Sequence, residues 1–70
     1  MKFSYVKFTS LSMKARMHYL QDKLIELGYN VQVTCKRDKQ TIKALMDFQE
    51  KNNITPNGVI CENTYNKLFI

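Results

Sequence analysis

A stripe of apolar residues in the first half of the chain follows the repeat of one face of an α-helix. Its members recur at intervals of four, three, four and three residues: Met13, Met17, Leu20, Leu24 and Leu27. Ser10 or Ser12 can cap this helix by accepting a hydrogen bond from a free backbone N–H. Gly28 stands where helices often end in a left-handed residue, and Tyr29 would then pack back on Leu24. The pattern predicts a helix over residues 13–27.

Two shorter helices are predicted in the second half of the chain, over residues 39–52 and 62–69. Asp38 can cap the first of them. Asn53 and Pro56 would end it, because asparagine tolerates left-handed geometry and proline cannot continue a helix. The side chains expected to be buried are Ile42, Leu45, Met46 and Phe48 on the first helix and Tyr65, Leu68 and Phe69 on the second.

Residues 1–10 are expected to form an N-terminal arm, and residues 11–70 a single helical domain. The apolar residues Phe3, Tyr5 and Val6–Phe8 fit either a short strand or an extended arm laid across the helices. A chain of 70 residues has room for one domain, since it buries only about 60% of the surface that its unfolded form exposes. The expected fold is all-α: a small three-helix bundle with an extended N-terminal arm.

Basic residues outnumber acidic residues by eleven to six, and the excess lies near the N-terminus. Residues 1–16 carry four basic side chains and no acidic one. Such a balance favours polyanionic partners, namely nucleic acid, anionic lipid or the anionic polymers of a bacterial wall, although it also suits a merely solubilising surface. A second basic cluster contains Lys36, Arg37, Lys39 and Lys43.

No apolar run approaches the roughly 20 residues needed to cross a bilayer, so we expect no membrane span. Lys7 interrupts the first apolar segment, and the sequence therefore predicts no secretory signal peptide. We expect the chain to be intracellular as made, or to be a segment of a longer protein.

The sequence predicts no catalytic residue, no metal site and no cofactor. Cys35, Cys61 and His18 are too few soft ligands for a zinc site. A thiolate–imidazole pair of Cys35 and His18 would lack an orienting third group. The carboxylates fall on solvated helix faces beside lysines, and no glycine-rich phosphate loop occurs. The two cysteines could form one disulfide in an oxidising compartment.

Three motifs occur in order along the chain. The first is M-x-x-L-Q-x-x-L-x-x-L-G-Y from Met17, the second is T-x-x-A-L-x-x-F-Q from Thr41, and the third is I-x-x-N-G-x-I-x-x-x-T-Y-x-x-L from Ile54. Together they resemble the small helical peptidoglycan-binding domain that accompanies many wall hydrolases and phage endolysins, over roughly residues 11–69. The resemblance implies an orthogonal three-helix arrangement in which the loops before the second and third helices lie near each other.

The chain departs from the family pattern in both loops. Residues 34–38, Thr-Cys-Lys-Arg-Asp, stand where the family has D-G-x-F-G, so both glycines are replaced. In the second loop Asn57-Gly58 is retained, but Cys61 replaces the last glycine of D-G-x-V-G. The loss of glycine predicts a reshaped first loop. Because Cys35 and Cys61 both fall on former glycine positions of neighbouring loops, the resemblance also implies that they lie close enough for a disulfide.

The candidate ligand-binding residues come from these loops and the adjoining helix ends. Each has a structural alternative: Tyr29 as a capping residue, Tyr65 in the core, Asn57 in its turn. Gln21 and Gln49 are interpreted as helix-to-loop hydrogen-bonding residues; their surroundings, LQDK and FQEK, echo each other over too short a stretch to define a repeat. The candidates are Tyr29, Arg37, Asn57, Gly58, Asn63 and Tyr65.

The function expected from the resemblance is non-catalytic binding of peptidoglycan or muropeptides. Such a module, from a phage or a bacterium, tethers a linked or separate wall hydrolase to its substrate. The alternative is a protein-interaction module on the same fold with rewritten loops, which binds a host protein. Nucleic-acid binding is not favoured, because the last helix offers a poor electrostatic face for a groove.

Overall fold

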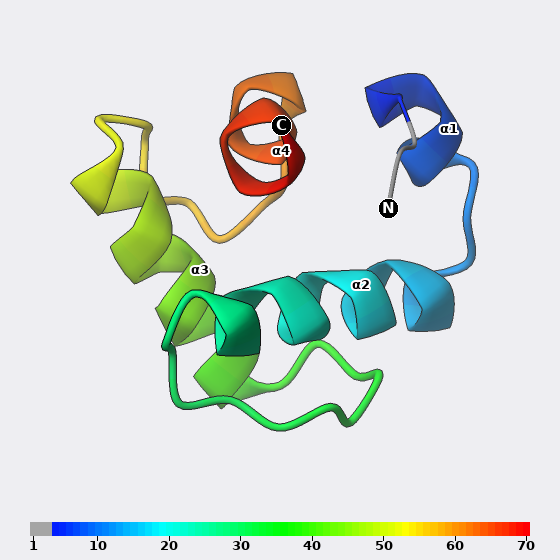
Figure 1. Ribbon diagram of the computed structural model, residues 1–70, viewed down its shortest axis with the longest axis horizontal. Helices are drawn as coiled ribbons and strands as arrows, with labels where there is room; N and C mark the ends of the chain where they lie inside the picture. The colour runs from blue at the N-terminus through cyan, green and yellow to red at the C-terminus, as the bar shows by residue number, and fades with distance from the viewer. Residues whose placement is uncertain (1–3) are drawn as a thin grey trace.

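The computed structural model describes residues 4–70, and within that range every regular element is a helix. In Figure 1, α2 and α3 cross, while α1 and α4 lie side by side on the same side of α2. The predicted small all-helical fold is confirmed. None of these helices is long and apolar enough to cross a membrane. The helices are α1 (Tyr5–Thr9), α2 (Met13–Glu26), α3 (Lys39–Lys51) and α4 (Glu62–Phe69).

The ends of α2 follow the sequence signals closely. The Ser12 side chain caps its start by accepting from the N–H of Ala15 at 3.2 Å. At its end Gly28 takes a φ of +96°. The N–H of Tyr29 then donates to the Leu24 carbonyl at 2.9 Å, and that of Gly28 to Ile25 at 2.9 Å. These paired bonds satisfy carbonyls that the helix leaves without partners, as the sequence predicted.

The same ending recurs on α3. Asn53 adopts a φ of +60°, and the N–H of Ile54 donates to the Gln49 carbonyl at 2.8 Å. The start of α3 is capped by Asp38, whose carboxylate accepts from the N–H of Thr41 at 2.9 Å. The predicted bounds of α2, α3 and α4 therefore agree with the structure to within one residue at each end.

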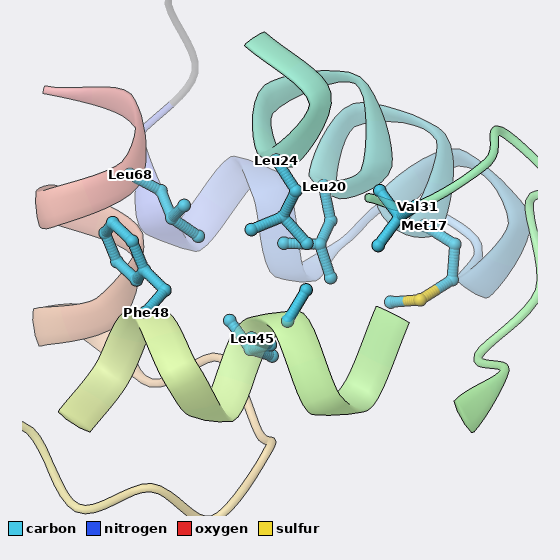
Figure 2. Close-up of a cluster of buried hydrophobic side chains, with 8 residues drawn as sticks. Met17, Leu20, Leu24, Val31, Leu45, Phe48 and Leu68 are labelled. Carbon is cyan, nitrogen blue, oxygen red and sulfur yellow. The ribbon is translucent and has the colours of Figure 1, made fainter. Parts of the chain in front are cut away.

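The core is a layer of apolar side chains between α2, α3 and α4 (Figure 2). Met46, which the sequence placed in this core, is instead 38% exposed. The buried face of α3 is centred on Leu45 and Phe48, and Met46 follows Leu45 by about 100° around the helix. The buried residues of the cluster are Met17, Leu20, Leu24, Val31, Ala44, Leu45, Phe48 and Leu68.

The N-terminal arm is helical from residue 5, so the expectation of a strand or an extended arm was wrong. Ser4 caps α1 through a bond from the N–H of Lys7 at 3.2 Å. Phe8 is buried, with its ring centroid 5.0 Å from that of Tyr65 and 5.7 Å from that of Phe69. A helix of this length is too short for its apolar repeat to be visible in the sequence. Packing against α4 stabilises its helical form. Phe3 lies outside the described residues.

Candidate functional site

Two short loops precede α3 and α4, and each is held by one buried glutamine. We call residues 34–38 loop A and residues 57–61 loop B. Gln21 on α2 holds loop A, and Gln49 on α3 holds loop B. Both side chains are fully buried. A buried amide requires hydrogen-bond partners, and in each case the backbone and side chains of the loop provide them.

Gln21 makes hydrogen bonds along most of loop A. Its Nε2 donates to Thr34 Oγ1 at 3.0 Å, to the Lys36 carbonyl at 2.9 Å and to Thr41 Oγ1 at 2.8 Å. Its Oε1 accepts from the backbone N–H groups of Thr34 and Cys35, both at 2.9 Å. One side chain thus fixes the path of the backbone into α3.

Gln49 repeats this arrangement in loop B. Its Nε2 donates to the Val59 carbonyl at 2.8 Å, to Thr64 Oγ1 at 3.1 Å and to Asn57 Oδ1 at 3.3 Å. Its Oε1 accepts from the N–H of Gly58 at 2.9 Å. The interpretation of both glutamines as helix-to-loop hydrogen-bonding residues is confirmed, and the short sequence echo marks a repeated structural unit.

The second residue of each loop has a left-handed backbone. Cys35 has a φ of +60° and Gly58 a φ of +72°. At Cys35, loop A therefore keeps the backbone that glycine would favour, although it contains no glycine. The reason is that Gln21 bonds the backbone on both sides of Cys35 and holds it in a conformation that L residues resist.

The two loops meet at a pocket of about 300 Å³. The Arg37 guanidinium of loop A comes within 3.8 Å of the position that a Cβ on Gly58 would occupy. We call this the inter-loop pocket. Its polar side chains are Thr9 and two arginines, and no acidic side chain of the described residues lines it. The lining is formed by Phe8, Thr9, Met13, Arg16, Met17, Arg37, Val59 and Ile60.

The sequence model of the peptidoglycan binding domain family matches residues 14–68, which include α3, both loops, and all of α2 and α4 except Met13 and Phe69. The chain belongs to this peptidoglycan-binding family. No curated protein and no solved structure shows significant similarity to it. The match leaves α1 outside, so part of the wall of the inter-loop pocket comes from residues that precede the family match.

Among the predicted ligand residues of this peptidoglycan-binding domain, Arg37 alone belongs to the described lining of the inter-loop pocket, and Gly58 lies beside Arg37. Asn57 is exposed, but its Oδ1 already accepts from the N–H of Val59 at 2.9 Å. Asn63 is exposed on the first turn of α4 and lies outside the described lining.

The two predicted tyrosines lie elsewhere. Tyr29 lines a separate hollow of about 270 Å³ beside Lys43 and Asp47 of α3. The Tyr65 side chain is fully buried, and burial raises the pKa of its hydroxyl above the ordinary 10.0. Its ring packs between Phe8 and Phe69, with centroids at 5.0 Å and 4.9 Å. Tyr65 therefore belongs to the core and offers no surface to a ligand, whereas Tyr29 packs against the core cluster and also lines this hollow.

Arg16 is the functional candidate that the sequence reading missed. Arg16 is one of the four basic residues among residues 1–16, and it lines the inter-loop pocket. Its Nε is buried and has no hydrogen-bond partner among residues 4–70. The available signal was its position directly before Met17, at the edge of the apolar stripe, which places the base of its side chain next to the core.

Both cysteines are free thiols, so the implied disulfide was wrong. Cys35 is the second residue of its loop, and its Sγ lies 3.9 Å from His18 Nδ1. Cys61 is the last residue of its loop, and its Sγ lies 3.4 Å from Thr64 Oγ1. Hydrogen bonding to the Thr64 hydroxyl lowers the pKa of the Cys61 thiol from its ordinary 9.0. The two glycine positions of the family pattern are thus structurally inequivalent.

Proposed function

We propose that this chain is a non-catalytic module that binds peptidoglycan at the inter-loop pocket. The single observation that carries the proposal is the family match over both loops and the three helices that position them. A pocket with two cationic side chains and an apolar lining adds a physical reason, because the peptides of peptidoglycan carry carboxylates beside small alkyl groups.

Arg37 is the residue we assign to direct ligand contact, because it is exposed and lies beside loop B. Asn57 and Asn63 lie at the exposed start of loop B and of α4. They are assigned to polar contacts at the rim. Gly58 contributes its close approach to Arg37 rather than a side chain. In a phage or bacterial wall protein, such a module raises the local concentration of a linked or separate hydrolase at its substrate.

Sedimentation with purified wall sacculi tests this function. We expect the chain to pellet with sacculi in about 0.5 M salt, where screening reduces simple charge attraction to a range of about 3–5 Å. Soluble muropeptides should release it. Arg37→Gln should lower the bound fraction, and Lys51→Gln, which removes one positive charge from the last turn of α3, should bind as the parent does.

A chain that stays in the supernatant at low salt would overturn the proposal. Pelleting that disappears with rising salt and ignores muropeptides would also overturn it, because it would show attraction to wall polyanions alone. Retention of full binding by Arg37→Gln would move the ligand away from the inter-loop pocket while leaving wall binding in place.

A further inference from the structure

The inter-loop pocket is built partly from a helix that the family match does not include. Phe8 and Thr9 of α1 and Met13 at the start of α2 precede residue 14, where the match begins. Phe8 is fixed in this wall by its ring contacts with Tyr65 and Phe69 of α4. Residues outside the family match therefore form an apolar wall beside the two loops, and this wall limits what can enter.

The charge in the pocket is unopposed. Arg16 and Arg37 both line it, and no acidic side chain of residues 4–70 does. The buried Nε of Arg16 lacks a partner in that same range. Buried polar atoms without a partner are rare in folded proteins, and each calls for an explanation. A guanidinium pairs best with a planar anion such as a carboxylate, which can accept two parallel hydrogen bonds.

The rest of the pocket lining favours a ligand that has small apolar groups next to its carboxylate. Met13, Met17, Val59 and Ile60 offer alkyl and thioether surface, and Thr9 is the only uncharged polar side chain in the described lining. A sugar ring would need several hydrogen-bonding partners, which this lining does not supply. The volume of about 300 Å³ is at the low end for ligand pockets and suits one or two small residues.

We infer that the inter-loop pocket binds the free carboxyl end of a short peptide with small alkyl side chains. Arg16 and Arg37 hold the carboxylate, and α1 with Met13 and Met17 covers the alkyl groups. The inference rests on the proposed function, because the stem peptides of peptidoglycan supply such ends. It assigns recognition to the free end of a stem peptide, and not to the glycan or to a cross-linked peptide.

Titration of the ¹⁵N-labelled chain with N-acetyl-D-alanyl-D-alanine, followed by two-dimensional NMR, tests the inference. We expect the largest shifts at the amides of Gly58, Val59 and Ile60. The carboxamide of the same dipeptide should bind at least tenfold more weakly, because it lacks the charge that the arginines would pair with. Equal affinity for the acid and the carboxamide would overturn the inference, as would shifts confined to the Tyr29 hollow.

Three variants and one control variant test which residues bind the dipeptide. Arg16→Gln and Arg37→Gln should each weaken dipeptide binding about tenfold, whereas Lys51→Gln should leave it unchanged. Val59 is 53% exposed, so Val59→Glu should fold and place a carboxylate of the chain itself beside the arginines. It should therefore abolish dipeptide binding. Because Arg37 and Val59 are exposed, these two variants keep the test valid even if Arg16→Gln fails to fold.

Two comparisons separate this inference from the proposed function. Full pelleting with sacculi combined with no response to the dipeptide would overturn the carboxylate pocket and leave wall binding intact. The D,D dipeptide should bind at least as well as the L,L form. Tighter binding of the L,L form, together with no pelleting, would overturn both statements, because it would indicate the carboxyl terminus of a protein as the occupant.

Discussion

A buried glutamine holds loop A and loop B in the same way, but the two loops tolerate different residues at their second position. In both loops a buried glutamine bonds a side-chain oxygen of the first residue, the N–H of the second, the carbonyl of the third and a threonine hydroxyl in the next helix. The left-handed second residue is Cys35 in loop A and Gly58 in loop B.

The surroundings of these two residues explain the difference. A Cβ on Gly58 would lie 3.0 Å from Ile42 Cγ2 and 3.5 Å from Met46 Cγ, so a side chain there would require Ile42 to shift. Cys35 is half-buried, and its thiol extends toward His18 at the surface. Loop A therefore accepts a side chain at a backbone cost of roughly 1–3 kcal/mol. The glutamine amide fixes the backbone of each loop, and the packing around the second residue determines which side chains fit there.

The largest expected effect comes from removing the amides themselves. Gln21→Met and Gln49→Met keep the side-chain volume but leave loop N–H and carbonyl groups without partners. Each should lower the free energy of unfolding by about 2–4 kcal/mol in urea titrations followed by circular dichroism. The loss should be greater at Gln49, because the Gly58 N–H that it binds is buried.

Gln40→Met, on the exposed face of α3, is the matched control and should change stability by less than about 0.5 kcal/mol. Equal stabilities for all three variants would show that the loops do not depend on the buried amides, and the comparison between loop A and loop B would lose its basis.

The second effect should have opposite signs in the two loops. Gly58→Ala should destabilise the fold by about 1–3 kcal/mol, because it meets Ile42 and strains a positive φ. Cys35→Gly should stabilise it by up to about 1 kcal/mol, since relief of left-handed strain exceeds the added flexibility of the unfolded chain. Thermal unfolding measures both.

Cys35→Ala controls for the thiol, because it keeps the Cβ and the strain while removing the sulfur. We expect its stability to match that of the parent. A stabilised Gly58→Ala variant would contradict the packing argument. Destabilisation by Cys35→Gly that Cys35→Ala also shows would mean that the contact with His18, and not the backbone, governs loop A.

The smallest effect concerns the caps, and its dependence on pH is confined to the acid range. The Thr41 hydroxyl and N–H both donate to the Asp38 carboxylate, which lowers its pKa below the ordinary 3.8. The charged form is thus favoured by folding. Its stabilisation is complete above pH 3.8 and is lost as the pH falls through the lower folded pKa.

The stability difference between the parent and Asp38→Asn should therefore shrink as the pH falls from about 5 to about 2. In loop B the capping position is Cys61, which has no carboxylate, so Cys61→Ser should retain the acid dependence of the parent. Guanidinium titrations at several pH values measure the difference. A constant gap between the parent and Asp38→Asn would show that the carboxylate is not stabilised by its hydrogen bonds to Thr41.

Part of the candidate site could be read from the sequence. Gln21 and Gln49 were interpreted correctly because they follow buried leucine and phenylalanine positions in matching motifs. The prediction that the two loops lie near each other rested on the family resemblance. Arg16 could not be recognised as a pocket residue, because the other walls of the pocket come from α1 and loop B, which lie far from each other in the chain.

The sequence by itself determined the three main helices and their ends. Apolar spacing, Asp38, Gly28 and Asn53 act within a few residues of their own positions, so local chemistry is sufficient to define them. Only the tertiary structure decided the helical form of α1, the burial of Tyr65 and the free state of the two thiols. These features depend on which side chains meet across the fold, and a five-residue helix such as α1 is too short to be stable without that packing.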